Sequence, residues 1–246
     1  MVWGTFGIVH FISLAACVGI IVGLYYFLKH LTVKTQIIIL GILSFAGIGA
    51  IIFNLLSWNS PLEYLPFHLC SLGALVLPIA TFTRNKVIAN LLLLWSLGAF
   101  FAILLNHAAA DFEILSWTFF FFYFPHVIEM GIPILLFKLG LTKLDKKCVI
   151  TTVGITMASY TVIHFINLII NALCVKNNIV DYAGNLIKVN YMYSLVPENP
   201  MLAFIWRIIP FEYWYMYGVI PIAVVYLGAI YSVHHFITKR KAMRRA

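Results

Sequence analysis

The chain has 246 residues, 63% of them hydrophobic and only 10% charged, with a formal net charge of +8. This apolar share lies far above the roughly 45–50% of a soluble globular domain, so the composition excludes a water-soluble protein. It also leaves no soluble basic domain that would carry nucleic-acid binding.

Seven apolar stretches are long enough to cross a hydrocarbon core, which takes about 20 residues of helix. They cover residues 6–28, 36–57, 61–82, 87–105, 117–138, 149–174 and 213–236. Each predicts a helix, because lipid offers no partner to an open backbone group and the stretches lack the alternation of a membrane barrel. The expected fold is all-α, a seven-helix membrane protein in one embedded domain of residues 1–246.

The basic residues predict the orientation, because cytoplasmic loops of membrane proteins carry an excess of Lys and Arg. Most of the 16 basic residues follow the first, third and fifth stretches or lie in the C-terminal tail, residues 237–246. They are Lys29, Lys34, Arg84, Lys86, Lys138, Lys143, Lys146, Lys147, Lys239, Arg240, Lys241, Arg244 and Arg245. We therefore expect an outer N-terminus, a cytoplasmic C-terminus and a multi-pass protein of the cell membrane.

The third stretch opens with a pattern typical of a helix start, with Ser60 as the cap and Pro61 in the first turn. A helix that starts there holds Pro66 in its interior, where proline removes a backbone hydrogen bond and kinks the helix. The sequence thus predicts a kink that frees the Leu62 carbonyl shortly before Cys70.

The longest loop, residues 175–212, lies on the outer side in this topology. Within it, Asn199 and Pro200 predict the cap and first turn of a short helix. Its apolar residues share one broad face, as in a helix that lies in the membrane interface: Met201, Leu202, Ile205, Ile208 and Ile209. Long loops often act as lids, and a tolerated outer insertion explains the segment equally well.

Polar and ionisable residues inside membrane helices are costly, which makes them candidates for a functional site. They are His10, His68, Cys70, His126, Glu129 and His164, with Asn54, Asn167 and Asn171 beside them. At about 1.5 Å per residue, Cys70, His126 and His164 lie roughly 13–15 Å below the outer helix ends, which predicts one shared cavity. Residues three apart share a helix face, so Tyr123 is expected on the same side as His126 and Glu129.

Cys70 is the candidate nucleophile of this cavity, and a cysteine nucleophile needs a base. His68 lies two positions away, about 200° round a regular helix, so a base from another helix fits better. His126 is the expected base, and Glu129, one turn below it, is expected to orient its ring. Donors for an oxyanion are available at Asn167 and Tyr191. At this depth, the natural ester is a phospholipid acyl chain or a lipid-anchored protein.

Other interpretations remain open at this point. A free cysteine is usually a small buried hydrophobe, and a membrane histidine often only bonds a neighbouring helix. The outer cavity would equally serve a protein that binds or transports a small solute. His68, His126 and His164 would together hold the catalytic zinc of a lipid hydrolase. The leading hypothesis needs no cofactor and no metal, takes membrane phospholipids or lipid esters as partners, and predicts neither nucleic acid nor a protein partner.

Four segments resemble a known family. "PLEYLPFHLCSLGAL" is similar to the W-x-LPLHLC pattern of bacterial YwaF-type integral membrane proteins, which are similar to the vertebrate transmembrane protein 164 family. "FFFFYFPHVIEMGIPIL" resembles the helix of that family that carries a single histidine. "INLIIN" and "NYMYSLVPENP" resemble its asparagine-bearing helix and its Asn-Tyr-Met segment.

This resemblance implies an activity and residue roles. The vertebrate members are acyltransferases that move fatty acyl chains between phospholipids through a cysteine and a histidine, and these roles fall on Cys70 and His126. Apart from these two carried-over roles, we expect supporting or substrate-binding roles for His68, Glu129, His164, Asn167, Asn190 and Tyr191. Bacterial relatives often have aspartate after the cysteine, where this chain has Ser71.

Overall fold

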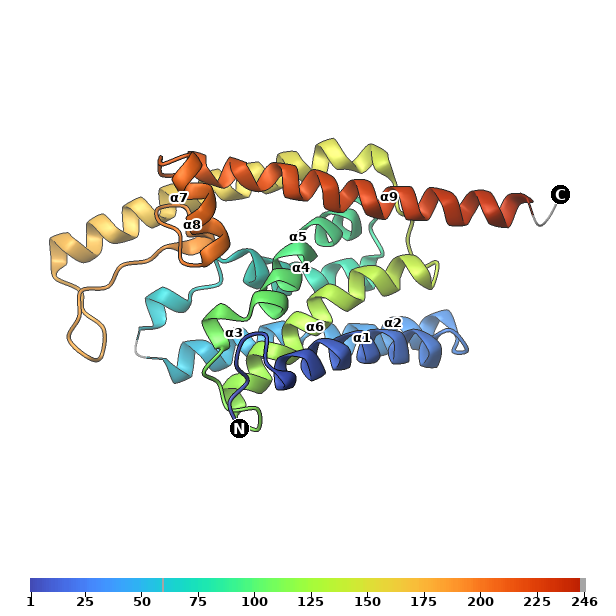
Figure 1. Cartoon of the computed structure of the whole chain (residues 1–246), viewed down its shortest axis with the longest axis horizontal. Coiled ribbons are helices and arrows are strands. Elements are labelled where there is room, and N and C mark those ends of the chain that lie inside the picture. The colour runs from blue at the N-terminus through green and yellow to red at the C-terminus, as the bar shows by residue number, and fades with distance from the viewer. Residues whose placement is uncertain (59, 244–246) are drawn as a thin grey trace.

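The computed structural model describes residues 1–58 and 60–243, and in this part of the chain every regular element is helical. The helices are α1 (Ile8–Leu28), α2 (Val33–Ser44), α3 (Ala46–Ser57), α4 (Leu69–Thr83), α5 (Lys86–Leu105), α6 (Trp117–Lys138), α7 (Val149–Asn177), α8 (Pro200–Ile208) and α9 (Ile220–Met243). Apart from the short α8, they run mainly along the long axis of the molecule (Figure 1). The prediction of an all-α fold is confirmed.

Among the described residues, six helical stretches are long and apolar enough to cross a membrane. They are Ile8–Leu28, Val33–Ser57, Lys86–Leu105, Trp117–Lys138, Lys146–Asn177 and Trp214–His234. The second of them contains both α2 and α3, which meet at Phe45. The remaining apolar helix, α4, has only 15 residues. The chain is therefore a multi-pass membrane protein. The predicted basic tail, residues 237–246, continues α9 as far as Met243, and its last three residues lie outside the described part.

The prediction of one continuous helix over residues 61–82 is wrong. A short 3-10 turn, Pro61–Tyr64, comes first, and Ser60 makes no side-chain cap hydrogen bond to it. Residues 65–68 are then not helical, and α4 begins only at Leu69. Proline disfavours the helical conformation of the residue before it, so Pro66 interrupts the helix instead of kinking it. The predicted free carbonyl of Leu62 exists, and the Tyr191 hydroxyl donates a hydrogen bond to it.

The short helix predicted in the outer loop is present as α8. The Asn199 side chain caps it by accepting from the Leu202 N–H at 2.9 Å, and proline stands in its first turn. Its predicted apolar face is only partly correct. Leu202 and Ile205 are buried against Tyr215, whereas Ile208 is 67% exposed.

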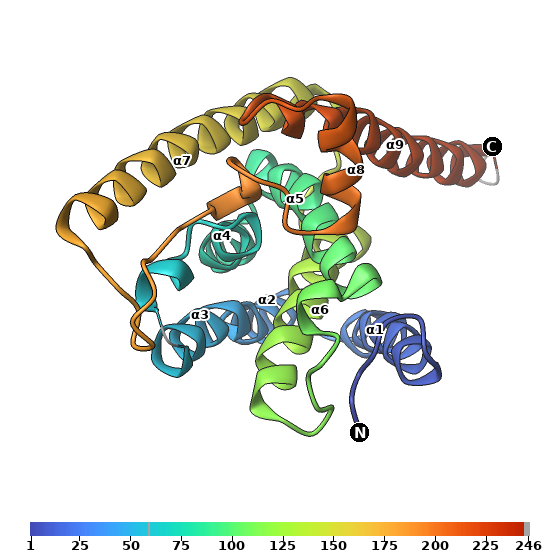
Figure 2. The same ribbon diagram turned by 60° about the vertical axis from the view of Figure 1, so that its left-hand side comes forward.

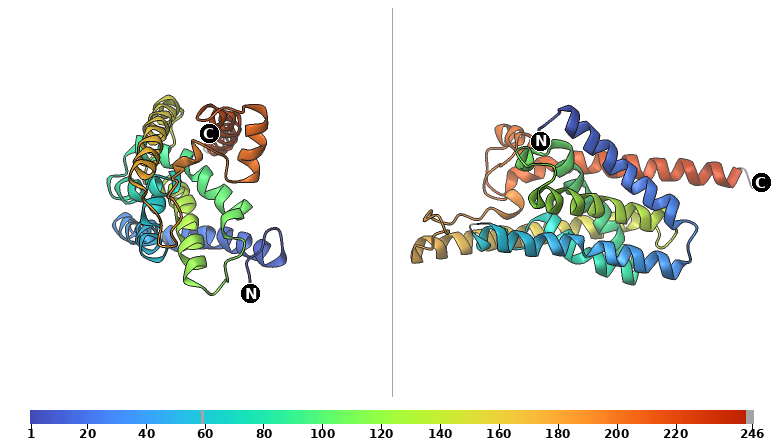
Figure 3. Two further views of the ribbon diagram at one scale, coloured as in Figure 1. Left: turned by 90° about the vertical axis from the view of Figure 1, so that its left-hand side faces the viewer. Right: turned by 90° about the horizontal axis from the view of Figure 1, so that it is seen from below.

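The helices differ widely in burial. In their most apolar stretches, 61% of α5 and 50% of α6 are buried, against 17% of α7 and 6% of α9. In Figure 2, α5 and α6 accordingly lie inside the bundle, with α1, α7 and α9 around them. Both α7 and α9 extend beyond the other helices, in opposite directions (Figure 3). These peripheral helices present an apolar surface that is suited to contact with lipid.

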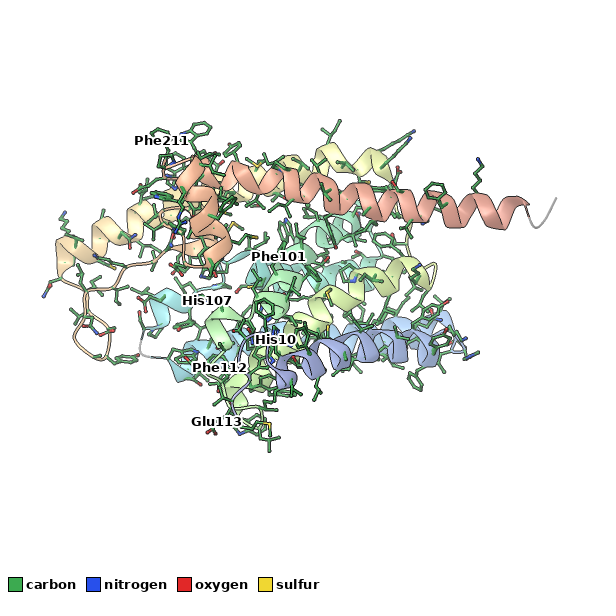
Figure 4. All side chains as sticks on the ribbon, in the orientation of Figure 1. His10, Phe101, His107, Phe112, Glu113 and Phe211 are labelled. Carbon is green, nitrogen blue, oxygen red and sulfur yellow. The ribbon has the colours of Figure 1, made fainter. Side chains whose placement is uncertain are left out.

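Buried polar groups bond the peripheral helices α1, α7 and α9 to α5. The Trp95 indole N–H donates to Thr156 of α7 at 2.8 Å, and the Ser96 and Tyr226 hydroxyls of α5 and α9 bond each other at 2.9 Å. On the other side, His10 of α1, labelled in Figure 4, bonds the Ile103 carbonyl at 2.9 Å. Such bonds are effective in membrane proteins because lipid tails provide no hydrophobic force between helices. His10 is thus a structural residue that joins α1 to α5.

Residues 187–196 form an irregular segment, with a short 3-10 turn at Tyr191–Tyr193, that we call the strap. It passes between α7 and α4 (Figure 2), and its Tyr191 side chain is fully buried. Two α7 asparagines bind its backbone. Asn167 exchanges hydrogen bonds with the Tyr191 N–H and carbonyl at 2.9 and 2.8 Å, and Asn171 does the same with Val189 at 2.8 and 2.9 Å. The loop is therefore an integral layer of the fold.

We predict that Asn167→Leu releases the strap. The substitution keeps the side-chain size but leaves the buried Tyr191 N–H without a partner, at about 1–3 kcal/mol, and the Tyr191 carbonyl with only the Ser194 N–H. We expect a protease to cut between α7 and α8 at least about tenfold faster in detergent-purified protein. The matched control is Asn177→Leu, because Asn177 is exposed and bonds only within its own helix. Equal cutting of the two variants would contradict the prediction.

Candidate functional site

Cys70 lies in the first turn of α4. The residue before the helix, His68, caps it without a side-chain hydrogen bond, and its carbonyl accepts from the Leu72 N–H at 2.9 Å. The first N–H groups of any helix lack intrahelical partners and carry the positive end of the helix dipole. The N–H groups of Cys70 and Ser71 and the Ser71 hydroxyl lie beside the Cys70 thiol. This helix end favours negative charge on the sulfur, whereas burial of the sulfur opposes it.

A small cavity borders this thiol inside the bundle. Its volume is about 10 Å³, which is the room that one water molecule needs. The lining residues come from α4, α5 and α6: Leu69, Cys70, Gly73, Leu77, Leu92, Trp95, Ser96 and Glu129. A thiol and a carboxyl from two different helices therefore face the same enclosed space.

Glu129 is the acid of this cavity. Its side chain is buried and lies within electrostatic range of both Cys70 and His126. Room for it comes from α3, because a Cβ added at Gly47 would lie 3.1 Å from the Glu129 Oε1 atom and 2.5 Å from the Cβ of Ala74. Gly47 thus lets α3 pack closely against both α4 and the carboxyl.

His126 lies one helical turn before Glu129 on α6 and is half-buried. Its Nδ1–H donates to the Phe122 carbonyl at 2.5 Å, which leaves Nε2 of the neutral ring as an acceptor. The sequence assigned this orienting role to Glu129, and in the structure a backbone carbonyl has it. The prediction that Tyr123 lies on the same side of α6 as Glu129 is wrong. The Tyr123 hydroxyl instead donates to the Ser13 carbonyl of α1 at 2.5 Å.

His68 faces the strap. The Met192 N–H donates to its Nδ1 at 3.4 Å, and the rings of Tyr191 and Tyr193 lie 5.6 and 5.5 Å from its own. Tyr193 in turn interacts electrostatically with Cys70. The strap therefore covers the start of α4 beside the thiol.

The predicted cavity shared by Cys70, His126 and His164 is not formed. The cavity at Cys70 is lined by neither histidine, and His164 faces the strap. The Nδ1 of His164 and the Ser194 hydroxyl lie 3.0 Å apart, and Asn167 donates to the same hydroxyl at 2.9 Å. Tyr160, His164, Asn167 and Asn171 share one face of α7 as predicted, and that face holds residues 189–213.

The predicted oxyanion donors are already engaged. The amide of Asn167 bonds Tyr191 and Ser194, and the Tyr191 hydroxyl donates to Leu62. Asn190 has its own structural role within the strap, where its amide donates to Val196 and Glu198 at 2.8 and 2.6 Å. The N–H groups in the first turn of α4 are the donors nearest to the thiol.

Sequence reasoning missed the α5 side of the cavity. Trp95 and Ser96 lie in a uniformly apolar stretch that gives no signal of a site, and Gly47 has no chemistry of its own. Only the packing of the helices places Trp95 and Ser96 beside the thiol and Gly47 beside the Glu129 carboxyl.

The geometry gives no support to a zinc centre. Within residues 1–58 and 60–243, no three His, Cys, Asp or Glu side chains gather closely enough to hold an ion. The three histidines considered for zinc instead have separate partners: Met192 for His68, Phe122 for His126 and Ser194 for His164.

A second, larger hollow lies on another face of α4, between this helix and α7. It has a volume of about 360 Å³, and its lining is apolar except for Ser159. Phe67 and Leu72 form the α4 side, and five residues between Ala158 and Ile166 form the α7 side. We call it the α4–α7 groove.

The fold and the site define a class, namely multi-pass helical membrane proteins with a thiol and a carboxyl in a cavity inside the bundle. The chain belongs to the TMEM164 family, whose family model matches residues 5–231. This match confirms the resemblance drawn from the segment around Cys70. No curated protein and no solved structure matches the chain.

We predict that Gly47→Ala destabilises the site where Gly49→Ala does not. The new methyl at residue 47 would lie 2.5 Å from the Ala74 Cβ, so α3 and α4 must separate, at about 1–3 kcal/mol for an overpacked core. At residue 49 it would meet only a Phe121 ring atom at 3.7 Å, an ordinary contact. Thermal unfolding followed by tryptophan fluorescence should show a lower Tm for Gly47→Ala alone. Equal Tm values would show that α3 and α4 are not tightly packed at Gly47.

Proposed function

We propose that the protein is an acyltransferase that moves a fatty acyl chain from a phospholipid or another lipid ester through a thioester on Cys70. The observation that carries this proposal is the position of the thiol in the first turn of a helix, beside a buried carboxyl, inside a membrane bundle. A thiol needs a nearby positive or basic group to react, and helix N-termini provide positive potential.

The first step transfers the acyl group to the protein. The Cys70 thiol gives its proton to Nε2 of His126, and the sulfur forms a bond to the carbonyl carbon of the lipid ester. The bond from that carbon to the alcohol oxygen then breaks, and His126 returns the proton to the leaving oxygen. The products are a Cys70 thioester and a lysolipid.

The second step reverses these roles. The hydroxyl of an acceptor lysolipid attacks the thioester carbon and gives its proton to His126. The carbon–sulfur bond breaks, and the proton passes to the Cys70 sulfur. With water as acceptor, the same step gives a free fatty acid, so hydrolysis is the water-accepting variant of this chemistry.

The geometry supports these roles in several ways. The Phe122 carbonyl fixes the His126 ring so that Nε2 accepts a proton, and Glu129 lies within electrostatic range of both this histidine and the thiol. The N–H groups beside the sulfur are suited to hold the negative oxygen of the tetrahedral intermediate. Removing one donor of this kind from an enzyme costs about 10²–10³ in rate.

Cys70 is partly exposed, but a lipid ester fits into the cavity beside its thiol only after movement. The cavity of about 10 Å³ has room for a water molecule but not for an ester group. The strap covers the start of α4, so its displacement is the simplest way to admit a lipid. A space this small also gives little support to a site for solute binding or transport.

We also propose the orientation and the place of the protein. α4 and the chain before it complete a seventh crossing, with an outer N-terminus and a cytoplasmic C-terminus in the cell membrane. Two of the basic loops do lie together, since the Lys86 Nζ and Asp145 Oδ2 atoms are 2.7 Å apart. The hydrogen bond from Lys86 holds the pKa of the Asp145 carboxyl below its usual range. This grouping supports a single basic face, as the positive-inside rule requires.

We predict that Cys70→Ala abolishes acyl transfer and that His126→Ala lowers it by about 10²–10⁴, the usual contribution of a general base. The assay uses protein in liposomes with a phospholipid donor and a lysophospholipid acceptor, read by lipid mass spectrometry. Mass spectrometry of the protein should also find an acyl group on Cys70 that hydroxylamine releases. His107→Ala, an exposed histidine in the loop after α5, is the control and should keep full activity.

Undiminished transfer by Cys70→Ala would reject the thioester mechanism. Free fatty acid as the main product would assign hydrolysis instead of transfer.

A further inference from the structure

The α4–α7 groove lies at the depth of the hydrocarbon core. Its α7 residues, from Ala158 to Ile166, straddle the middle of a 29-residue helix that is long enough to span the membrane. At about 1.5 Å per residue, they lie roughly 14–28 Å from either end of that helix. Val162 in the groove is 58% exposed, so the groove is open to the surrounding bilayer.

The groove has the size of a ligand site. Its volume of about 360 Å³ falls in the range of about 300–1,000 Å³ that is typical of ligand pockets. The strap closes its outer part, where Tyr191 and Met192 pack with Phe67, Leu72 and Ile163. The groove is thus a shallow, open apolar hollow that the strap borders on one side, unlike the convex lipid-facing surface of a single helix.

The groove also reaches the turn that carries the thiol. Phe67 lies three residues before Cys70 and Leu72 two residues after it, on a helix about 10 Å wide. Phe67 and Leu72 of the groove flank the start of α4, and the first two residues of this helix, Leu69 and Cys70, line the Cys70 cavity. His68 and the strap residue Met192 lie at this end.

We propose that the α4–α7 groove binds the fatty acyl chain of a membrane phospholipid, with the ester end of the chain directed to the first turn of α4. Hydrocarbon is the matching occupant, because the lining is apolar and the groove opens into the hydrocarbon core. Only the direction of the ester end rests on the proposed transferase function, since the groove would bind a chain without any reaction.

The experiment fills the groove with a large side chain. Val162→Trp places an indole in it, and Val153→Trp is the matched control, nine residues away and so about 180° round α7. Each variant is reconstituted with a phosphatidylcholine whose acyl chain carries a diazirine near its end. After illumination, mass spectrometry measures the label on residues 67–72 and 158–166, and acyl transfer is assayed in parallel with short and long donor chains.

We expect Val162→Trp to reduce labelling of these residues by about tenfold, because the indole excludes the chain, while Val153→Trp retains native labelling. We also expect Val162→Trp to raise KM for long chains more than for short ones. Labelling that is equal in the two variants would overturn the groove proposal, as would crosslinks from these residues to a second copy of the chain. Loss of labelling in Val162→Trp without any transfer by the native protein would support the groove and reject the transferase function.

Discussion

The structure depends on a constraint of the bilayer: a backbone group in hydrocarbon must find its partner inside the protein. The chain breaks its helix between Tyr64 and Leu69, and in the proposed seven-crossing topology this break is submerged. α4 has 15 residues and a length of about 22 Å, against a hydrocarbon core about 30 Å thick. In that topology its first turn begins well below the membrane surface. The strap provides such partners. The Tyr191 hydroxyl donates to the Leu62 carbonyl, and the Met192 N–H donates to the Nδ1 atom of His68.

The strap has the same requirement, and α7 meets it. An irregular segment buried in a membrane bundle leaves backbone N–H and carbonyl groups without a regular ladder of partners, and Asn167 and Asn171 pair with those of Tyr191 and Val189. Because the strap lies between α7 and α4, the two helices cannot pack directly in the outer half of the bundle. The α4–α7 groove is the space that remains below the strap. The break before α4 thus explains why the strap is needed, why α7 carries asparagines that bind it, and why the groove remains.

Most of the helices were predictable from the sequence, because length and apolar composition decide a membrane helix with little help from tertiary packing. The cap at Asn199 was also readable, since it depends on two adjacent residues. Pro66 marked an irregularity, but whether a proline kinks a helix or ends it depends on whether a partner such as Tyr191 exists for the freed carbonyl. The site was less predictable. Equal depth suggested that His164 joins Cys70, whereas depth carries no information about which helix a side chain faces.

The submerged helix start also makes a membrane interior compatible with thiol chemistry. Burial in apolar surroundings opposes any charge, and a thiol in the middle of a helix would have no N–H groups beside it. Cys70 has such groups because α4 begins one residue before it. The interruption at Pro66 thus places donors and helix dipole beside the sulfur without any cationic side chain in the lipid. Had the helix started at Pro61, the same cysteine would lie about two and a half turns into it and be a small hydrophobic residue like the buried Cys17.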